Sequence, residues 1–462
     1  MKKTLLIIQF LLVSLSAGAT VTLPSFFSDH MVLQQKRKRP FFGKSNAPFV
    51  SVTTSWDNRT YKATVANNRW EVLLKTPSYG GPYTITIDDN VKVQLKNIMI
   101  GEVWLCSGQS NMQMPLSGWG RVNNFEAEIN GANYPDIRLL MPVQHTAKFP
   151  QDDFSECPGW QVCSPETIAQ FSSTAYFFAR NLYNELHIPI GLINSSWPGT
   201  VIEAWTSRDA LRTIHDFDEG LALLQDDLKL KAKDAAVKKE GEQWEQLLED
   251  YNAKHGPDER AAASFNFDDA PWKSHRLPSF WESSVMPNFD GIVYYRKKIT
   301  VSKAVSGQEA FLRFYADDDD KVWVNGELIG ESKGYKIQRN YKIKKGLLKE
   351  GENTVLIKVF DGGGGGGIYG QPQEFIITAE NETISLAGEW RYTVGADLRN
   401  LSPRPSMPRT EDMPTAIYNE MINPLIRTQL AGVIWYQGES NAPRAHQYQT
   451  LFPLIITDWR KQ

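Results

Sequence analysis

The sequence predicts an α/β protein whose parallel sheet is preceded by a small β-sandwich and interrupted by a second all-β region. Residues 20–97 contain only short runs of β-branched and aromatic residues separated by turn residues. From residue 98 onward, apolar strand runs alternate with helical periodicity, which is typical of a parallel sheet. Residues 280–395 return to the first pattern. The length of 462 residues fits about three domains.

The composition excludes two classes of protein. Hydrophobic residues make up 41% of the chain, which is enough for packed cores and excludes global disorder. Lys and Arg number 50 while Asp and Glu number 53, so the net charge of −3 argues against a nucleic-acid-binding protein. The 14 Trp and 17 Tyr residues fit either core packing or stacking on sugar faces, and composition does not decide between these two roles.

The N-terminus has the pattern of a secretory signal peptide. Lys2 and Lys3 precede an apolar run over residues 5–15, and Ala17-Gly18-Ala19 follows it. We expect residues 1–19 to be cleaved after Ala19 and the mature protein to be exported to the periplasm or the extracellular space. The apolar run is too short to span a bilayer comfortably, and no other stretch is apolar enough, so we expect no membrane span in the mature chain.

The three cysteines are Cys106, Cys157 and Cys163, and this odd number leaves at least one thiol free. Cys157 and Cys163 could form a disulfide that closes a small loop, or could be two buried thiols. Cys106 lies in an apolar strand pattern, so we expect it in the core.

The predicted domains follow from the order of these elements. An N-terminal β-sandwich covers residues 20–97, with strands at 50–54, 61–65, 70–74, 83–87 and 91–95. An α/β domain has its first part at 98–279 and its second part at 396–462, with strands at 98–106, 189–194 and 430–436 and a helix at 173–186. A polar helical stretch covers about 218–255, and its apolar stripe is Leu221, Leu224, Leu228, Ala232 and Ala235.

The inserted β domain covers residues 280–395, with strands at 294–299, 310–315, 321–324 and 354–359. Asn325-Gly326 predicts a two-residue hairpin turn. The six glycines at 362–367 form a flexible loop without the Lys and Ser or Thr of a phosphate-binding loop. The four aspartates at 317–320 could bind calcium, but they lack EF-hand spacing, and we favour a solvated turn.

Three predicted strands end in small and polar residues, within residues 101–112, 191–200 and 432–441. Active groups of open parallel sheets gather at the carboxyl ends of the strands, so these three segments could meet in one crevice. Ser110 follows its strand beside Gly108 and suits a nucleophile for acyl transfer. The backbone of Ser110 and Gly199, with Gln437 or Asn441, could form the oxyanion hole.

These segments resemble the signature blocks of the sialate O-acetylesterases, which are SGNH-type carbohydrate esterases with a flavodoxin-like three-layer α/β/α fold. The blocks are residues 101–112, 195–205 and 435–441, and residues 23–34 and 448–460 extend the resemblance. It implies that Ser110 is the nucleophile and that Gly199 and Gln437 form the oxyanion hole, with Asn441 a further candidate. It also implies that residues 280–395 are a galactose-binding-like jelly roll. Gln109 stands where many SGNH enzymes have Asp.

The catalytic base of this family comes from an Asp-x-x-His pair, and none of the seven histidines has Asp three residues before it. We therefore expect the chain to be truncated at its C-terminus, with the second part of the esterase domain incomplete. His446 is a weak substitute for the base. Glu203 and Glu439 could orient a base or brace the loops, and Gln109 and Asn111 are further supporting candidates.

These observations predict an exported serine esterase that removes O-acetyl groups from sialic acids or related acetylated glycans. The expected partner is the acetylated glycan, and the chemistry requires no metal and no organic cofactor. The alternative is a non-catalytic carbohydrate-binding protein, which the two β regions and the missing histidine favour. A glycosidase is less well supported, because no catalytic domain with paired carboxylates is visible.

Overall fold

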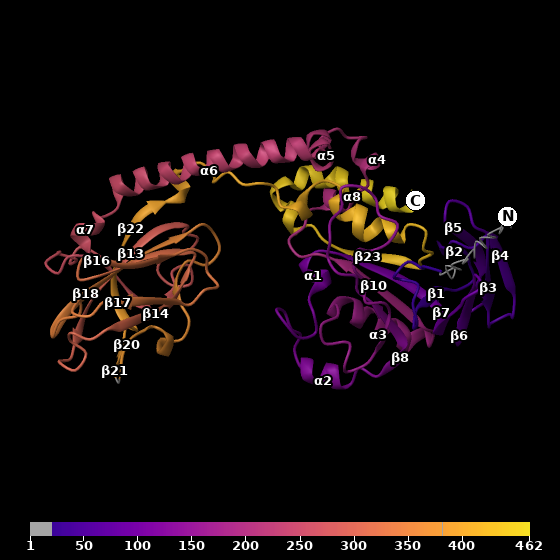
Figure 1. The fold of residues 1–462 in the computed structure, drawn as a ribbon, viewed down its shortest axis with the longest axis horizontal. Coiled ribbons are helices and arrows are strands. Elements are labelled where there is room, and N and C mark those ends of the chain that lie inside the picture. The colour runs from indigo at the N-terminus through magenta and orange to yellow at the C-terminus, as the bar shows by residue number, and fades with distance from the viewer. Residues whose placement is uncertain (1–20, 381) are drawn as a thin grey trace, which may run out of the picture. The chain divides into compact units, whose positions relative to one another are not determined.

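A computed structural model describes residues 21–380 and 382–462 of the chain. The chain divides into two compact units, one formed by the described residues up to Lys231 together with Pro408–Gln462 and the other by Ala232–Met407 (Figure 1). The predicted signal peptide lies outside the described residues. The second unit extends beyond both predicted ends of the inserted domain, residues 280 and 395.

The first unit is built on a nine-stranded sheet around one long strand, β7 (Lys92–Gly108). The first half of β7 is antiparallel to β6 (Gly80–Asp88), and its second half lies parallel to both β10 (Ile190–Ser196) and β23 (Gly432–Tyr436). The two strands predicted at 91–95 and 98–106 are therefore one strand. The predicted boundary between residues 97 and 98 falls inside β7, so the N-terminal β region and the parallel sheet share it.

The other N-terminal strands agree with the predicted runs to within three residues at each end. They are β3 (Phe49–Thr54), β4 (Thr60–Thr64) and β5 (Arg69–Lys75), and the sequence did not predict β1 (Val32–Gln34) or β2 (Lys38–Lys44). Alternate residues along β5 are buried and exposed, as expected for a strand with one face on a core. Phe41, Val52 and Leu74 contribute to this core.

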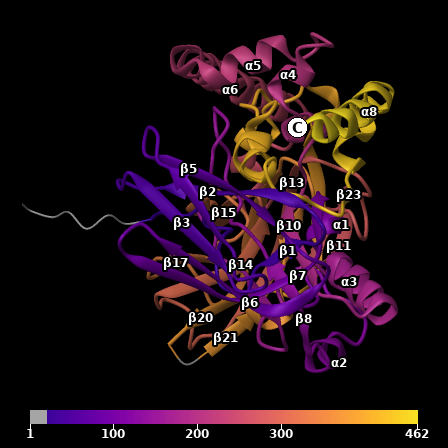
Figure 2. The ribbon, with the colours of Figure 1, turned by 90° about the vertical axis from the view of Figure 1, so that its right-hand side faces the viewer.

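Helices cover both faces of the parallel part of the sheet, which gives a mixed α/β fold. Cys106 and Leu192 face a core that includes Tyr176 of α3 (Ser173–Leu186), the helix that the sequence predicted. Their neighbours Leu105 and Ile193 face a second core that includes residues of α8 (Ala445–Lys461). The alternation arises because successive side chains of a strand point to opposite faces. Figures 1 and 2 show α3 and α8 on opposite sides of the sheet. Two further strands are β8 (Tyr134–Leu140) and β9 (Gln161–Cys163).

The polar helical stretch differs from the prediction. It consists of α5 (Asp218–Gln225) and α6 (Asp227–His255), separated at Asp226. Leu221 and Leu224 of the predicted stripe are buried, but the other three members are exposed, namely Leu228, Ala232 and Ala235. The buried face of α6 is instead further along the helix, where Trp244 and Leu248 pack with Ile292 and Tyr294 inside the second unit.

Two six-stranded sheets form the second unit. One has the order β11-β22-β13-β18-β15-β16 and the other contains β12, β19, β14, β20 and β21 with β17 paired to β14. The strand bounds are β11 Lys273–Leu277, β12 Ser279–Phe280, β13 Gly291–Val301, β14 Ala310–Asp317, β15 Asp319–Val324, β16 Glu327–Ser332, β17 Arg339–Ile343, β18 Gly351–Asp361, β19 Gly367–Tyr369, β20 Ile376–Ala379, β21 Glu382–Ser385 and β22 Gly388–Asp397. Both sheets contribute side chains to one core.

Two turns of this unit were predicted with different success. The hairpin at Asn325-Gly326 is confirmed, because β15 and β16 pair across it with Val324 opposite Glu327 and both turn residues have positive φ. The prediction of a solvated turn at residues 317–320 is wrong. Asp320 is buried, accepts a hydrogen bond from Tyr341 and forms an ion pair with the buried Arg339.

The three cysteines are free thiols, and Cys106 lies in the core as predicted. Of the two alternatives for Cys157 and Cys163, the disulfide is therefore not formed. Cys163 is a buried thiol and Cys157 is a half-buried thiol. Among the described residues, no helix combines the length and the apolar character needed to cross a membrane.

Candidate active site

The structure brings the three predicted loop segments together at the carboxyl end of β7. Gly108, the last residue of β7, lies opposite Ser196 of β10 on one side and Tyr436 of β23 on the other. Its carbonyl oxygen accepts a hydrogen bond from Trp197 N at 2.9 Å, and the next amide, Gln109 N, donates to Tyr436 O at 2.9 Å. Segments that are far apart in the sequence therefore share backbone hydrogen bonds beside Ser110.

Gly108 is required at this junction. Its φ of +137° lies in the region that favours glycine, and a Cβ atom would be 2.1 Å from Tyr436 O. The turn leads directly into α1 (Ser110–Gln113), in which Met112 N and Gln113 N donate to Gln109 O. Ser110 is thereby placed on a turn between a strand and a short helix, half-exposed, with a hydroxyl that has no hydrogen-bond partner among the described residues.

Gln109 and Asn111 connect the first segment to the third. The buried Gln109 accepts hydrogen bonds through Oε1 from Gly438 N at 3.1 Å and Ser440 N at 3.3 Å. Asn111 Nδ2 donates to Glu439 Oε1 at 2.6 Å. Gln109, Asn111 and Glu439, which were predicted as supporting residues, therefore hold the first and third loops together on the two sides of Ser110.

Asn441 and Glu203 form a second brace. Asn441 Oδ1 accepts from Ile202 N at 3.0 Å, and its Nδ2 donates to Glu203 Oε2 at 3.0 Å. Glu203 Oε1 accepts from Arg444 at 2.6 Å. Both side chains are buried, and among the described residues no histidine contacts Glu203. One hydrogen of the Asn441 amide is thus bonded to Glu203, and the oxyanion role of Asn441 stays a prediction.

The Gln437 amide is also engaged. Its Nε2 donates to Thr200 O at 3.1 Å and to Asn441 Oδ1 at 2.7 Å, while its buried Oε1 has no partner. Both of its hydrogens are therefore used, and Gln437 does not donate into the site in this conformation. The side chain instead connects the second and third segments.

The backbone of Gly199 remains suited to the oxyanion hole. Within the described chain, the N–H groups of Ser110 and Gly199 have no acceptor. Gly199 has a φ of +72°, and its carbonyl accepts from Arg409 Nη2 at 2.6 Å. Asp412 holds the guanidinium at 2.6 Å and raises the pKa of Arg409 through this hydrogen bond. The loop is thus anchored while its amide is free to donate.

Two residues at the site were missed at the sequence level. Arg409 follows the second unit in the chain, 210 residues after Gly199, and no local pattern connects the two. Tyr448 Oη donates to Gln437 O at 2.9 Å, and burial raises the pKa of this phenol. Tyr448 begins the last segment of the family resemblance and lies on α8, so its position on a helix following the third loop was a usable signal.

No base contacts the candidate nucleophile. In the described part of the chain, no histidine nitrogen is hydrogen-bonded to Ser110; His30, His215 and His255 bond to Asn97, Asp218 and Tyr251. His446 is exposed at the beginning of α8. The described residues therefore provide a free hydroxyl and free amide donors without a base.

A half-exposed serine at the end of a parallel strand, where the loop of a neighbouring strand also begins, is typical of hydrolases that act by acyl transfer. Comparisons with known proteins agree with this class. The chain is 32% identical to the sialate O-acetylesterase of Mus musculus over 220 residues and 32% identical to that of Homo sapiens over 218 residues. Each match covers 43% of this chain, and the chain covers 40% and 41% of these relatives.

A solved structure of a carbohydrate acetylesterase from Xanthomonas citri is 30% identical, with a TM-score of 0.40, and the match covers 42% of this chain and 44% of that chain. No family model matches the chain. The predicted resemblance to the sialate O-acetylesterases is confirmed. The chain spans less than half the length of the curated relatives that it matches.

Proposed function

We propose that this chain is an exported carbohydrate esterase that hydrolyses O-acetyl esters of sialic acids or related glycans, with Ser110 as the nucleophile. The observation that carries the proposal is the hydrogen bonding of Gly108 and Gln109 to both neighbouring loops, beside a serine with a free hydroxyl. The similarity to proteins named sialate O-acetylesterase supports the acetylated sugar as substrate. The residues at 1–19 support export through their signal-peptide pattern.

The proposal extends to the architecture. The layers of helices α3 and α8 around the parallel strands fit an SGNH-type, flavodoxin-like domain. The N-terminal strands fit a β-sandwich that continues into this domain, and the two sheets of the second unit fit a galactose-binding-like jelly roll. A jelly roll of this kind would serve as an accessory glycan-binding module.

The proposed reaction follows from the groups at the site. Ser110 Oγ attacks the acetyl carbonyl carbon while a base takes its proton, and the N–H groups of Ser110 and Gly199 stabilise the oxyanion. The sugar oxygen leaves with a proton, and water then releases acetate from the acyl serine. Because no base contacts Ser110 among the described residues, we expect slow hydrolysis that an added base accelerates.

The test measures acetate release from an O-acetylated sialoside with and without imidazole. Imidazole acts as a diffusible general base, so it should raise the rate of the unaltered protein well above that of Ser110→Ala. Ser107→Ala is the matched control, because Ser107 lies three residues earlier and its buried hydroxyl has no partner. Equal rates for the unaltered protein and Ser110→Ala would contradict the assignment of the nucleophile.

The same preparations distinguish the second candidate function. Sugar binding in a calorimetric titration, without acetate release under either condition, would favour a non-catalytic carbohydrate-binding protein. The free Ser110 hydroxyl and the unbonded Gly199 amide favour the esterase, because a binding site alone does not need an unpartnered nucleophile.

A further inference from the structure

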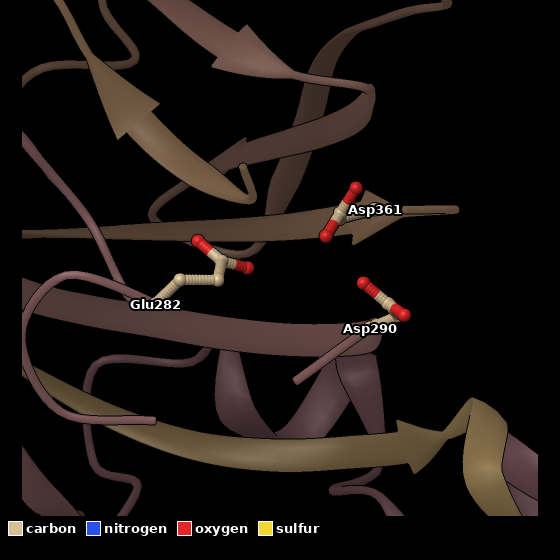
Figure 3. A group of neighbouring side chains, drawn as sticks. All are labelled: Glu282, Asp290 and Asp361. Carbon is tan, nitrogen blue, oxygen red and sulfur yellow. The ribbon is translucent and has the colours of Figure 1, made fainter. Parts of the chain in front are cut away.

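Three carboxylates meet at one end of the second unit. Glu282 follows β12, Asp290 precedes β13 and Asp361 is the last residue of β18. Figure 3 shows the three carboxylates facing a common space. One oxygen of each lies within 4.8 Å of the others. Carboxylates repel one another at this separation, so the arrangement requires a compensating charge or bound protons.

Two of these groups have buried oxygen atoms without a hydrogen-bond partner. The Asp361 side chain is fully buried; its Oδ1 accepts from Gly363 N at 2.9 Å, while its Oδ2 has no partner. Glu282 Oε2 accepts from Gly366 N at 2.8 Å, while its buried Oε1 has no partner. An unpaired buried carboxylate oxygen is costly, so it points to a ligand for these atoms.

Among the residues that the structure describes, no lysine, arginine or histidine forms an ion pair with these three carboxylates. The nearby Arg399 and Arg339 are paired with Asp397 and Asp320.

The pKa values of the buried Asp361 and the half-buried Glu282 reflect this excess of negative charge. Burial, together with repulsion from Asp290 and Glu282, raises the pKa of Asp361 to about 7. Burial and the charge of Asp290 also raise the pKa of Glu282.

The glycine-rich segment lets the backbone approach the carboxylates. A Cβ atom on Gly366 would be 2.6 Å from Asp361 Oδ2 and 2.0 Å from the ring of Trp281. Any side chain at this position would therefore displace the carboxylate or the indole. Gly362 N donates to Asp318 Oδ2 at 3.0 Å, so the run of glycines follows the surface of the acidic group.

A neighbouring pair of aspartates adds to the negative field. Asp317, Asp318 and Asp361 form a second group of oxygens within 4.8 Å of one another. Burial and the hydrogen bond with Asp318 raise the pKa of Asp317 to about 7. Asp318 Oδ2 is bonded to the backbone, whereas Glu282 and Asp361 each keep one buried oxygen without a partner, so the first group is the better ligand set.

We propose that Glu282, Asp290 and Asp361 bind one Ca²⁺ ion. Ca²⁺ prefers carboxylate oxygens at about 2.4 Å, so two ligands on opposite sides of one ion lie up to about 4.8 Å apart. Mg²⁺ requires a tighter and more regular octahedron. The ion would join the segment that follows β12, the beginning of β13 and the end of β18, and would stabilise this end of the second unit.

The experiment uses the full chain after treatment with a chelator. Terbium, which occupies calcium sites, should luminesce on excitation of Trp281, and Ca²⁺ should displace it with a stoichiometry of one. Calcium alone should also raise the melting temperature, because an ion that binds only the folded state stabilises it. Mg²⁺ at the same concentration should give a smaller shift.

Asp361→Asn and Asp290→Asn should each weaken Ca²⁺ binding by about tenfold or more, because affinity depends on the number of ligand charges. Glu350→Gln is the matched control; it removes an exposed carboxylate of the same unit and should bind Ca²⁺ normally. Asp290 is half-buried, so its variant remains informative if Asp361→Asn does not fold. If calcium does not shift the melting temperature of the unaltered protein, or if both variants bind Ca²⁺ as tightly as the unaltered protein does, the three carboxylates do not bind the ion and share protons instead.

Discussion

Two groups of carboxylates, one in each unit, have opposite surroundings. In the first unit, Glu203 accepts from Asn441 and Arg444, and Asp458 accepts from the backbone and hydroxyl of Ser207 at 2.9 and 2.7 Å. In the second unit, Asp361 and Glu282 each keep one buried oxygen without a partner and face another carboxylate. A buried acid surrounded by donors positions its neighbours, whereas buried acids that face one another point to a ligand.

This contrast also separates the braces from the reactive group in the first unit. Gln109, Glu203 and Asn441 have bonded polar atoms, and they hold the three loops. Ser110 lies among them, half-exposed, and no side chain or backbone group of the described residues bonds to its hydroxyl. The half-exposed serine at the junction of the loops, rather than a bonded or a fully buried group, is therefore the candidate for chemistry.

The largest expected effect concerns the junction of the three loops. Gly108→Ala places a Cβ atom 2.1 Å from Tyr436 O at a positive φ, so we expect a loss of about 3 kcal/mol in the free energy of unfolding, together with loss of the proposed esterase activity. Urea denaturation measures the first quantity. Gly241→Ala in α6 is the control; nothing lies within 4 Å of that position, and alanine should stabilise the helix by about 0.5–1 kcal/mol. If Gly108→Ala leaves the free energy of unfolding unchanged, the described contact between Gly108 and Tyr436 is wrong.

A pair of charge-removing variants tests the comparison directly. Glu203→Gln should lower the free energy of unfolding by about 2 kcal/mol, because it leaves donors of Asn441 or Arg444 without an acceptor. Asp361→Asn, without calcium, should raise it by about 1 kcal/mol, because it removes repulsion between carboxylates. Denaturation in a chelating buffer measures both values. Effects of the same sign in the two units would remove the distinction between them.

The sequence predicted local elements better than long-range groupings. The helix at 173–186 was predicted with correct bounds, because its amphipathic pattern follows Ser172, whose side chain accepts from Ala175 N as an N-cap. The continuity of β7 was missed because Asn97, with a φ of +56°, has the character of a turn residue inside a strand. Leu228 follows the helical period and is nevertheless exposed, since tertiary packing decides which face is buried.

The two candidate sites differ in how far the sequence could predict them. The loops around Ser110 were found because each follows a strand, and parallel strands end at one edge of a sheet. Glu282, Asp290 and Asp361 do not share such a pattern. The run at 317–320 indicated a solvated turn, and only the pairing of the strands brings Asp361 to Glu282.

The smallest expected effect concerns a buried histidine of the second unit, His275. His275 bonds to Tyr295 Oη at 3.1 Å and Ser284 Oγ at 2.9 Å, and burial lowers its pKa despite the opposing charge of Glu389. Its neutral form is favoured in the folded state, so its contribution to stability is complete above the ordinary pKa of 6.5 and decreases as the pH falls below that value.

The difference between the unaltered protein and His275→Gln isolates this contribution, because the acidic group titrates in both. The difference in the free energy of unfolding should shrink by about 1 kcal/mol or less between pH 7 and pH 5.5. Thermal or urea denaturation at the two pH values measures it. A difference that does not depend on pH would mean that His275 is not held neutral by its surroundings.

The most direct test of the central claim is to trap the acyl serine. The chain is incubated with an activated acetyl ester and imidazole, and its peptides are examined by mass spectrometry. We predict an acetyl group on the peptide that contains Ser110 in the unaltered protein and in Ser107→Ala, and none on that peptide in Ser110→Ala. Acetylation confined to lysine residues, equal in all three proteins, would contradict the account.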